Sequence, residues 1–241
     1  IRLDRRAWLA ASSGLVGMAA FPVAAEDPAS KRYQFCAFIK FVQTLPFDVL
    51  ADRIAAMGFD GIEATVRDGG HVLPERVEED LPRLVDAMKK RRLDVTIMAS
   101  SVNSVKHPLT EKVLRTAAGL GIKRYRLAYL RYDLSRSIPA QLEEHRAQLK
   151  DLAALNQELG ISGVYQNHAG ATTVGSAIWD LRDLLRGIPP EALSVAFDIR
   201  HATVEGGYNW PLNLKLIKPH LGALYVKDFT WKPGSHEAVN V

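Results

Sequence analysis

Short apolar segments alternate with amphipathic helical segments along most of the chain, and this alternation limits the possible folds more than any other feature. Seven segments have the length and the β-branched or aromatic content of buried strands: residues 34–39, 61–66, 94–99, 124–127, 163–166, 193–198 and 221–226. Helical spacing of apolar residues predicts helices at residues 47–57, 74–92, 110–120, 140–159, 176–186 and around 212–217. Strands separated by helices in this way pair in parallel through crossover connections.

The length of each strand–helix unit favours a (βα)8 TIM barrel, because the units repeat every ~30 residues. An open doubly wound sheet is the alternative fold. Neither the GxGxxG nor the GxxxxGK phosphate-binding pattern follows an early strand, which counts against that alternative. The 241 residues hold seven such strands, so we expect a barrel truncated after about seven units. Residues 231–241 are expected to be the loop that leaves the seventh strand.

Several expected helix ends carry the residues that helix ends favour. Gly58, Gly121 and Gly160 follow three of the predicted helices, and Pro74 begins another. Ser176 is predicted to cap the helix at 176–186, because a serine hydroxyl accepts a hydrogen bond from the first free backbone N–H groups.

The first 25 residues have the pattern of an export signal. Arg5 and Arg6 precede the uncharged stretch 7–25, which ends in small residues. The paired arginines indicate the twin-arginine route, so we expect a signal peptide at 1–25, a linker at 26–32, the barrel at 33–241 and a periplasmic or secreted protein. A membrane anchor is the alternative, but the stretch is interrupted by serine, glycine and proline and has low hydropathy for a span. No membrane attachment is expected after cleavage.

Charge and cysteine content exclude other classes of protein. The net charge is +4, and three arginines and one aspartate in residues 1–25 account for two of these charges, so +2 remains for the barrel. That excess is too small to predict nucleic-acid binding. Cys36 is the one cysteine, so no internal disulfide can form, and its apolar neighbours predict a buried strand residue.

Polar side chains gather where the predicted strands end, which is where barrel enzymes carry their active sites. The candidates, in chain order, are Lys40, Glu63, His71, Gln166, Asn167, His168, Asp198, His201, Trp210 and Lys227. Lys40, His71 and Asn167 are predicted to line the substrate pocket. Glu63 interrupts an apolar strand, so it either faces the barrel mouth or pairs with a basic neighbour.

The expected chemistry is proton transfer. Asp198 and His201 stand three residues apart at one strand end, where a carboxylate and an imidazole can orient each other or bind a metal. His168 or His201 is the predicted general acid and base, since imidazole titrates near neutral pH. Lys227 would polarise a substrate oxygen, and Trp210 could stack on a sugar ring.

Four segments together resemble the xylose-isomerase-like TIM-barrel superfamily of sugar isomerases and epimerases. They are residues 58–63 (GFDGIE), 166–170 (QNHAG), 198–202 (DIRHA) and 225–228 (YVKD). The resemblance covers residues 33 to about 231. It implies a (βα)8 barrel, a small-molecule carbohydrate substrate, and one divalent metal such as Mn, Zn, Mg or Co.

The resemblance also assigns metal ligands, and the sequence departs from them. Asp198 matches the family's aspartate ligand, and His201 matches a histidine that contacts substrate. Gln166 stands where the family has a glutamate ligand, and Tyr225 where it has a histidine. Either the metal site has moved, onto Glu63, His168, Asp198 or His201, or the protein works without metal.

The sequence therefore predicts an exported carbohydrate isomerase or epimerase that acts on a non-phosphorylated sugar or keto-sugar by proton transfer beside a carbonyl. A lyase or dehydratase acting on a 3-keto-sugar is the alternative within enzymes, and a non-catalytic sugar-binding barrel is the alternative outside them. The substrate and the oligomeric state are left open.

Overall fold

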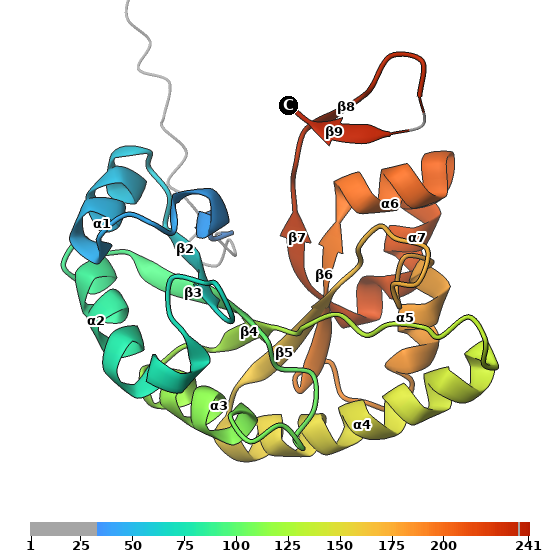
Figure 1. The fold of residues 1–241 in the computed structure, drawn as a ribbon, viewed down its shortest axis with the longest axis horizontal. Coiled ribbons are helices and arrows are strands. Elements are labelled where there is room, and N and C mark those ends of the chain that lie inside the picture. The colour runs from blue at the N-terminus through green and yellow to red at the C-terminus, as the bar shows by residue number, and fades with distance from the viewer. Residues whose placement is uncertain (1–32, 236) are drawn as a thin grey trace, which may run out of the picture. The chain divides into compact units, whose positions relative to one another are not determined.

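Seven parallel strands form one curved sheet in the computed structural model, which describes residues 33–235 and 237–241 (Figure 1). The strands are β1 (Cys36–Phe38), β2 (Gly61–Val66), β3 (Asp94–Ser100), β4 (Arg124–Arg126), β5 (Ser162–Gln166), β6 (Leu193–Asp198) and β7 (Leu221–Tyr225). Each strand pairs with the next along the chain. This sequential order is that of a (βα)8 barrel and not that of a doubly wound sheet, whose order reverses.

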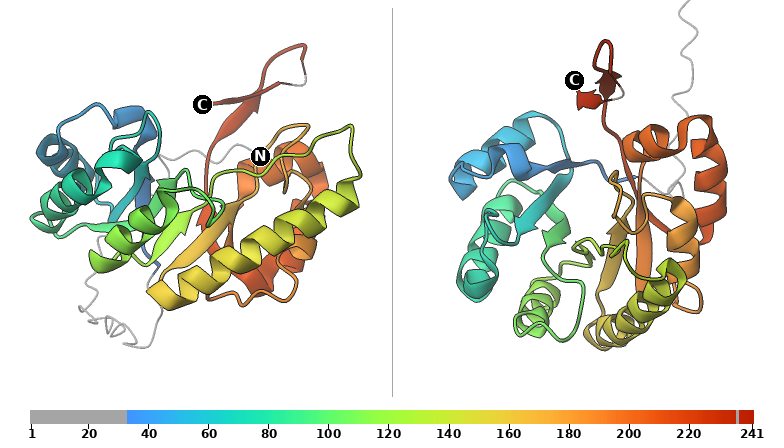
Figure 2. Two further views of the ribbon diagram at one scale, coloured as in Figure 1. Left: turned by 60° about the horizontal axis from the view of Figure 1, so that its bottom comes forward. Right: turned by 45° about the vertical axis from the view of Figure 1, so that its right-hand side comes forward.

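Helices cover the convex face of the sheet (Figure 2). They are α1 (Phe47–Ala56), α2 (Val77–Lys89), α3 (Thr110–Gly119), α4 (Ile138–Leu159), α5 (Ile178–Leu184), α6 (Ile199–Gly206) and α7 (Trp210–Ile217), with short 3-10 turns at η1 (Ile39–Val42), η2 (Pro74–Arg76), η3 (Gly207–Asn209) and η4 (Lys218–His220). The predicted fold class is thus confirmed. Within the described residues the sheet is open, with β1 and β7 at its edges.

Apolar side chains fill two layers. The larger core lies between the sheet and the helices and includes the fully buried Leu50 of α1 and Leu84 of α2. A small cluster of Ile97, Val164 and Ala196 is separate from it. Side chains two residues apart in a strand share a face. Gln166 and Asp198 therefore follow Val164 and Ala196 on the same face, which puts a polar layer directly beyond a small apolar one.

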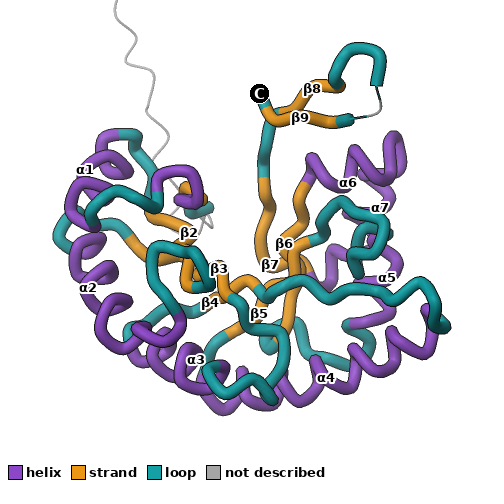
Figure 3. Tube along the Cα trace, in the orientation of Figure 1, coloured by secondary structure: helices purple, strands orange, loops and turns teal. Residues whose placement is uncertain are grey.

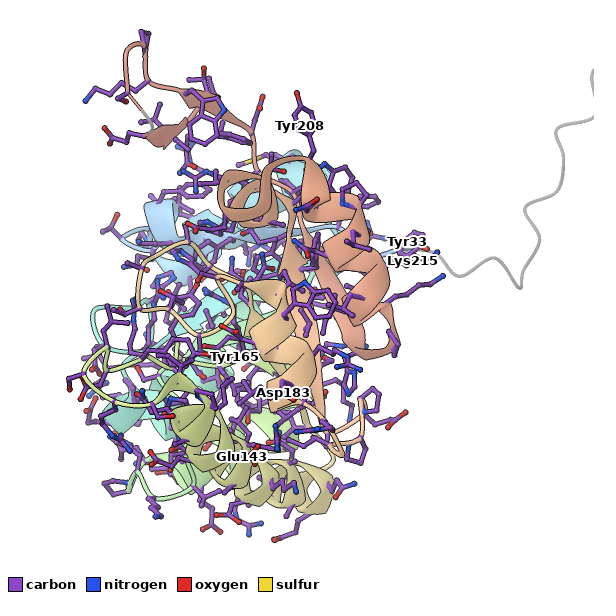
Figure 4. All side chains as sticks on the ribbon, turned by 90° about the vertical axis from the view of Figure 1, so that its right-hand side faces the viewer. Tyr33, Glu143, Tyr165, Asp183, Tyr208 and Lys215 are labelled. Atoms are coloured by element: carbon purple, nitrogen blue, oxygen red, sulfur yellow. The ribbon has the colours of Figure 1, made fainter. Side chains whose placement is uncertain are left out.

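An ion-pair cluster joins the two helices α4 and α5 on the outside. Arg146 of α4 lies 2.6 Å from a carboxylate oxygen of Glu143 and 3.2 Å from one of Asp183 in α5. Its Nε atom also donates to the Asp183 backbone carbonyl. Figure 4 shows Glu143 and Asp183 on neighbouring helices, with Tyr165 of β5 in the interior. This cluster fixes how the two helices pack.

Four local predictions were wrong. β1 ends at Phe38, because Ile39 begins the turn η1. The helix expected at 74–92 is divided into η2 and α2. Ser176 does not cap α5, which begins at Ile178 with Ala177 as its N-cap residue. The serine instead belongs to a turn, in which its backbone N–H donates to the Thr173 carbonyl.

The fourth error concerns the region after β7, where a loop was expected. Two short strands, β8 (Phe229–Trp231) and β9 (Ala238–Asn240), pair there as an antiparallel hairpin (Figure 3). The rings of Phe229 and Trp231 meet edge to face at 5.7 Å, which favours the extended conformation of this segment. The hairpin is a sheet of its own and does not extend the barrel sheet.

The predicted signal peptide and linker, residues 1–32, lie outside the described residues. Across residues 33–235 and 237–241, no helix has both the length and the hydropathy that a membrane span requires.

Candidate active site

Polar side chains from β2, β4, β5 and β6 meet toward the carboxyl ends of these strands, which lie together because the strands are parallel. They are Glu63, Arg126, Gln166 and Asp198, all buried. Lys227 joins them from the segment after β7 and is one-third exposed. A hydrogen-bonded chain connects all five side chains.

Arg126 is the centre of this chain. Its Nε donates to Oε1 of Glu63 at 2.6 Å, and the two side chains are only 6% and 3% exposed. Its Nη1 donates to Oε1 of Gln166 at 2.6 Å and contacts the Tyr129 hydroxyl at 3.0 Å. Burial disfavours the charge on Arg126, but the carboxylate of Glu63 and the hydroxyl groups of Tyr129 and Tyr225 together outweigh burial, so the pKa of Arg126 is raised.

Gln166 is held in one orientation from both sides. Its Oε1 accepts hydrogen bonds from Arg126 and from the Tyr129 hydroxyl at 2.7 Å, while its Nε2 donates to Oδ2 of Asp198 at 2.7 Å. The reverse orientation of the amide would place two donors against each other at Arg126 and two acceptors at Asp198. The network therefore fixes which end of the amide faces which partner.

Asp198 has three partners besides Gln166. Its Oδ2 lies 2.5 Å from Nζ of Lys227. Its Oδ1 accepts from the backbone N–H of His201 at 3.1 Å and so caps the start of α6. Asn167 fixes the backbone of Asp198 by two hydrogen bonds, donating to its carbonyl at 3.0 Å and accepting from its N–H at 2.7 Å. Asn167 thus positions the carboxylate.

Two histidines lie beside this ion pair. The ring centroids of His168 and His201 are 3.9 Å apart. The ring of Tyr129 also packs on His168, with 4.8 Å between the two centroids. Burial lowers the pKa of both imidazoles, and the positive charge of Lys227 lowers each further. Both rings are therefore neutral near pH 7. His168 Nδ1 lies 2.9 Å from the Ala169 carbonyl and donates to it, which leaves Nε2 as a free base.

Three of the predicted site residues lie apart from this network. Lys40 is exposed in η1. His71 packs edge-on against Phe47 of α1 at 4.7 Å, and burial lowers its pKa. Trp210 begins α7 and packs against the large core. In the described part of the chain, none of the three contacts the Arg126–Lys227 network by a hydrogen bond, ion pair or ring contact.

The side chains at the expected metal position do not fit a divalent ion. The amide oxygen of Gln166 already accepts two hydrogen bonds, so it has no free lone pair to offer. Oδ2 of Asp198 faces the Lys227 ammonium and an amide N–H. A metal ion here would lie against two fixed cations, Lys227 and Arg126.

The other candidate ligands do not complete a binding site for a divalent metal ion. The hydroxyl of Tyr225 is buried, and burial, with the charge of Glu63, raises the pKa of Tyr225 well above its ordinary value. The neutral phenol is a poor ligand for these ions. Among residues 33–235 and 237–241, no three His, Cys, Asp or Glu side chains are grouped to hold a metal, so a set moved onto Glu63, His168, Asp198 and His201 is not assembled.

Sequence reasoning missed Arg126 and Tyr129. Arg126 ends β4 in an Arg-Tyr-Arg segment, in which the local pattern does not show which side chain faces inward. The signal that could have found it was Glu63, since a carboxylate in an apolar strand requires a buried cation. The expectation that Glu63 pairs with a basic residue agrees with its ion pair to Arg126.

Comparison with known proteins supports the fold. The family model described as xylose isomerase-like TIM barrel matches residues 51–240. No curated protein matches the sequence. Among solved structures, the probable 3-DHS dehydratase AsbF of Bacillus anthracis is similar with a TM-score of 0.66 at 13% identity, covering 82% of this chain and 74% of that one.

Two epimerase structures are similar to the same degree. The 3-keto-D-glucoside 4-epimerase YcjR of E. coli has a TM-score of 0.65 at 15% identity, covering 82% of this chain and 80% of its own. The D-psicose 3-epimerase of Clostridium cellulolyticum has a TM-score of 0.63 at 11% identity, covering 81% and 73%. At these identities the likeness shows a shared fold.

Proposed function

Because the chain belongs to the xylose isomerase-like TIM barrel family, we propose that it is an enzyme that moves a proton at a carbon beside the carbonyl of a sugar or keto-sugar. The observation that carries this proposal is that His168 and Lys227 both contact His201. The His168 ring lies 3.9 Å from the His201 ring, and Nζ of Lys227 lies 3.5 Å from its Nε2. A neutral base and a cation thus lie beside the same imidazole ring.

His168 acts as the base in this proposal. Its free Nε2 takes the proton from the carbon next to the carbonyl, and negative charge then develops on the carbonyl oxygen. The Lys227 ammonium donates a hydrogen bond to that oxygen and stabilises the charge. Asp198 holds Lys227 in place, and His201 packs against the base. Return of the proton to the same carbon or to its neighbour gives an epimer or an isomer.

A dehydratase is the second candidate, and the number of free bases favours it. Glu63 is bound to Arg126, and Asp198 is bound to Lys227, so neither carboxylate is free to take a proton. In the described residues of this site, His168 is then the one unengaged base. Loss of a proton and a β-hydroxyl needs one base, whereas inversion across two faces of a carbon is easier with two. The names of the similar structures include both epimerases and a dehydratase.

Solvent exchange tests the proposal and separates the two reactions. The protein is incubated with a panel of ketoses and 3-keto-sugars in D2O and followed by NMR. Deuterium at the carbon beside the carbonyl, with a new sugar, indicates isomerisation or epimerisation, and loss of water indicates elimination. His168→Gln should abolish exchange. His220→Gln is the control, because His220 contacts Ile188 near the opposite ends of the strands. Exchange that survives His168→Gln contradicts the role of His168.

We also propose that the protein is exported to the periplasm or beyond. The support is the Arg5-Arg6 pair before the uncharged stretch 7–25. Arg5→Lys with Arg6→Lys keeps both charges and should still block export through the twin-arginine route. Cell fractionation measures the outcome, and unchanged export of the double variant would contradict the route.

A further inference from the structure

Two guanidinium groups lie near the ring of Phe38 at the β1–β2 side of the site. The Cζ atom of Arg126 is 5.1 Å from the ring centroid, and that of Arg67, in the loop after β2, is 5.8 Å from it. Arg67 is half-buried. Its side chain makes no hydrogen bond or ion pair with any residue in the described part of the chain. Nη2 of Arg126 likewise has no partner among those residues.

The carboxylates that could neutralise Arg67 are already engaged. Glu63 pairs with Arg126 at 2.6 Å, and Asp198 pairs with Lys227 at 2.5 Å. Burial lowers the pKa of Arg67, and the positive charge of Arg126 lowers it further, while Glu63 opposes both effects. Arginine keeps its charge in proteins, so Arg67 is a half-buried cation without a counter-ion. Such a group costs free energy unless an anion binds to it.

We propose that Arg67 and the free Nη2 of Arg126 bind the carboxylate of the substrate, which makes the substrate a keto-sugar acid. This inference rests on the proposed function and specifies its substrate class. Guanidinium groups present planar pairs of donors that match the two oxygens of a carboxylate. A phosphate would suit the same donors, so binding of the matching phosphates is measured beside that of the acids.

Tyr129 links the anion site to the reacting groups. Its hydroxyl lies 3.0 Å from Nη1 of Arg126, and its ring lies 4.8 Å from the ring of His168. One side chain therefore spans from Arg126 to the base. In this proposal the carboxylate of the sugar acid lies at the arginines and an inner carbon lies at His168.

Matched pairs of ligands test the proposal. D-fructuronate differs from D-fructose, and D-tagaturonate from D-tagatose, by a carboxylate in place of the terminal hydroxymethyl group. Calorimetry should show that at least one acid binds at least about tenfold more tightly than its neutral partner. Arg67→Ala should remove this preference and leave binding of the neutral ketose within about twofold. Arg182→Ala is the control, because Arg182 is an exposed arginine of α5.

Several outcomes would overturn the assignment. They are equal binding of acid and neutral partner in every pair, an acid preference that survives both Arg67→Ala and Arg67→Gln, and tightest binding of the corresponding 6-phosphates. Thermal unfolding of both variants checks that they are folded. Deuterium exchange is scored separately. Exchange with neutral ketoses and no acid preference contradicts this site alone, whereas acid binding that depends on Arg67 without exchange on any substrate contradicts the enzymatic function alone.

Discussion

The Nζ atom of Lys227 lies 2.5 Å from Oδ2 of Asp198, which places a fixed cation on the buried carboxylate of β6. The register of the sheet produces this contact. Asp198 pairs with Tyr225 across β6 and β7, and Lys227 follows Tyr225 by two residues, on the same side of the chain. The carboxylate is thereby neutralised by the chain itself.

This contact predicts a protein that works without a metal ion. We expect elemental mass spectrometry of the purified protein to find well below one equivalent of Mn, Zn, Mg or Co. Chelator should leave deuterium exchange and the midpoint of thermal unfolding unchanged, because Lys227 and Arg126 already supply the positive charge.

A double variant should create the metal site that the wild-type protein lacks. Gln166→Glu with Lys227→Ala supplies a carboxylate and removes a cation, so added Mn should raise its thermal midpoint more than that of the wild type. Two results would contradict the prediction that the protein works without a metal. One is a tightly bound metal ion in each wild-type chain, and the other is activity that chelation removes and added metal restores.

The buried pair of Glu63 and Arg126 should be the costliest to break. Glu63→Gln leaves the Arg126 guanidinium without its carboxylate, so we expect a loss of about 3–5 kcal/mol in the free energy of unfolding, measured with urea. Glu111→Gln removes a carboxylate from the exposed Arg115 pair and should lower the free energy of unfolding far less. Similar losses in the two variants would show that the buried pair adds no special stability.

The fold was predictable because its signals are local. Apolar strand segments and the glycines after helices predicted all seven strands of the barrel sheet and the end of α4 at Gly160. The site was less predictable. The structure brings together five residues that were candidates because they follow strands: Asn167, His168, Asp198, His201 and Lys227.

The errors arose where the decisive contacts are distant or where one residue has two roles. Arg126 is 63 residues from Glu63, so no local pattern connects them. Helix α6 was missed because Asp198 is both the last residue of β6 and the N-cap of the helix, which leaves no loop between the elements. Trp210 is partly buried against the large core, and its expected contact with a sugar stays a prediction.

Two glycines at helix ends should respond oppositely to alanine. Gly160 ends α4 with a φ of 64°, a conformation that alanine adopts at a cost, although no atom lies within 4 Å of the added Cβ. Gly160→Ala should therefore lower the free energy of unfolding by about 1 kcal/mol. Gly119 lies within α3, also in open space, and Gly119→Ala should raise it by up to about 1 kcal/mol. Urea unfolding measures both, and the same sign for both would contradict the conformational argument.

Lowering the pH should destabilise the protein through the buried His201. Burial lowers the pKa of His201 below its ordinary value of 6.5. Below pH 6.5 the imidazole of the unfolded chain takes up a proton that the folded protein does not, so acid favours unfolding. The stability that the neutral His201 contributes is therefore fully present only above this pH. From about pH 7.5 to about pH 5.5, His201 should account for a loss of about 1.4 kcal/mol in the free energy of unfolding. His201→Gln should reduce this slope, whereas Gln141→Ala, a buried substitution in α4 without a titrating group, should lower stability equally at both pH values. An unchanged slope in His201→Gln would mean that this imidazole titrates in the folded protein as it does in the unfolded chain, which would contradict the lowered pKa.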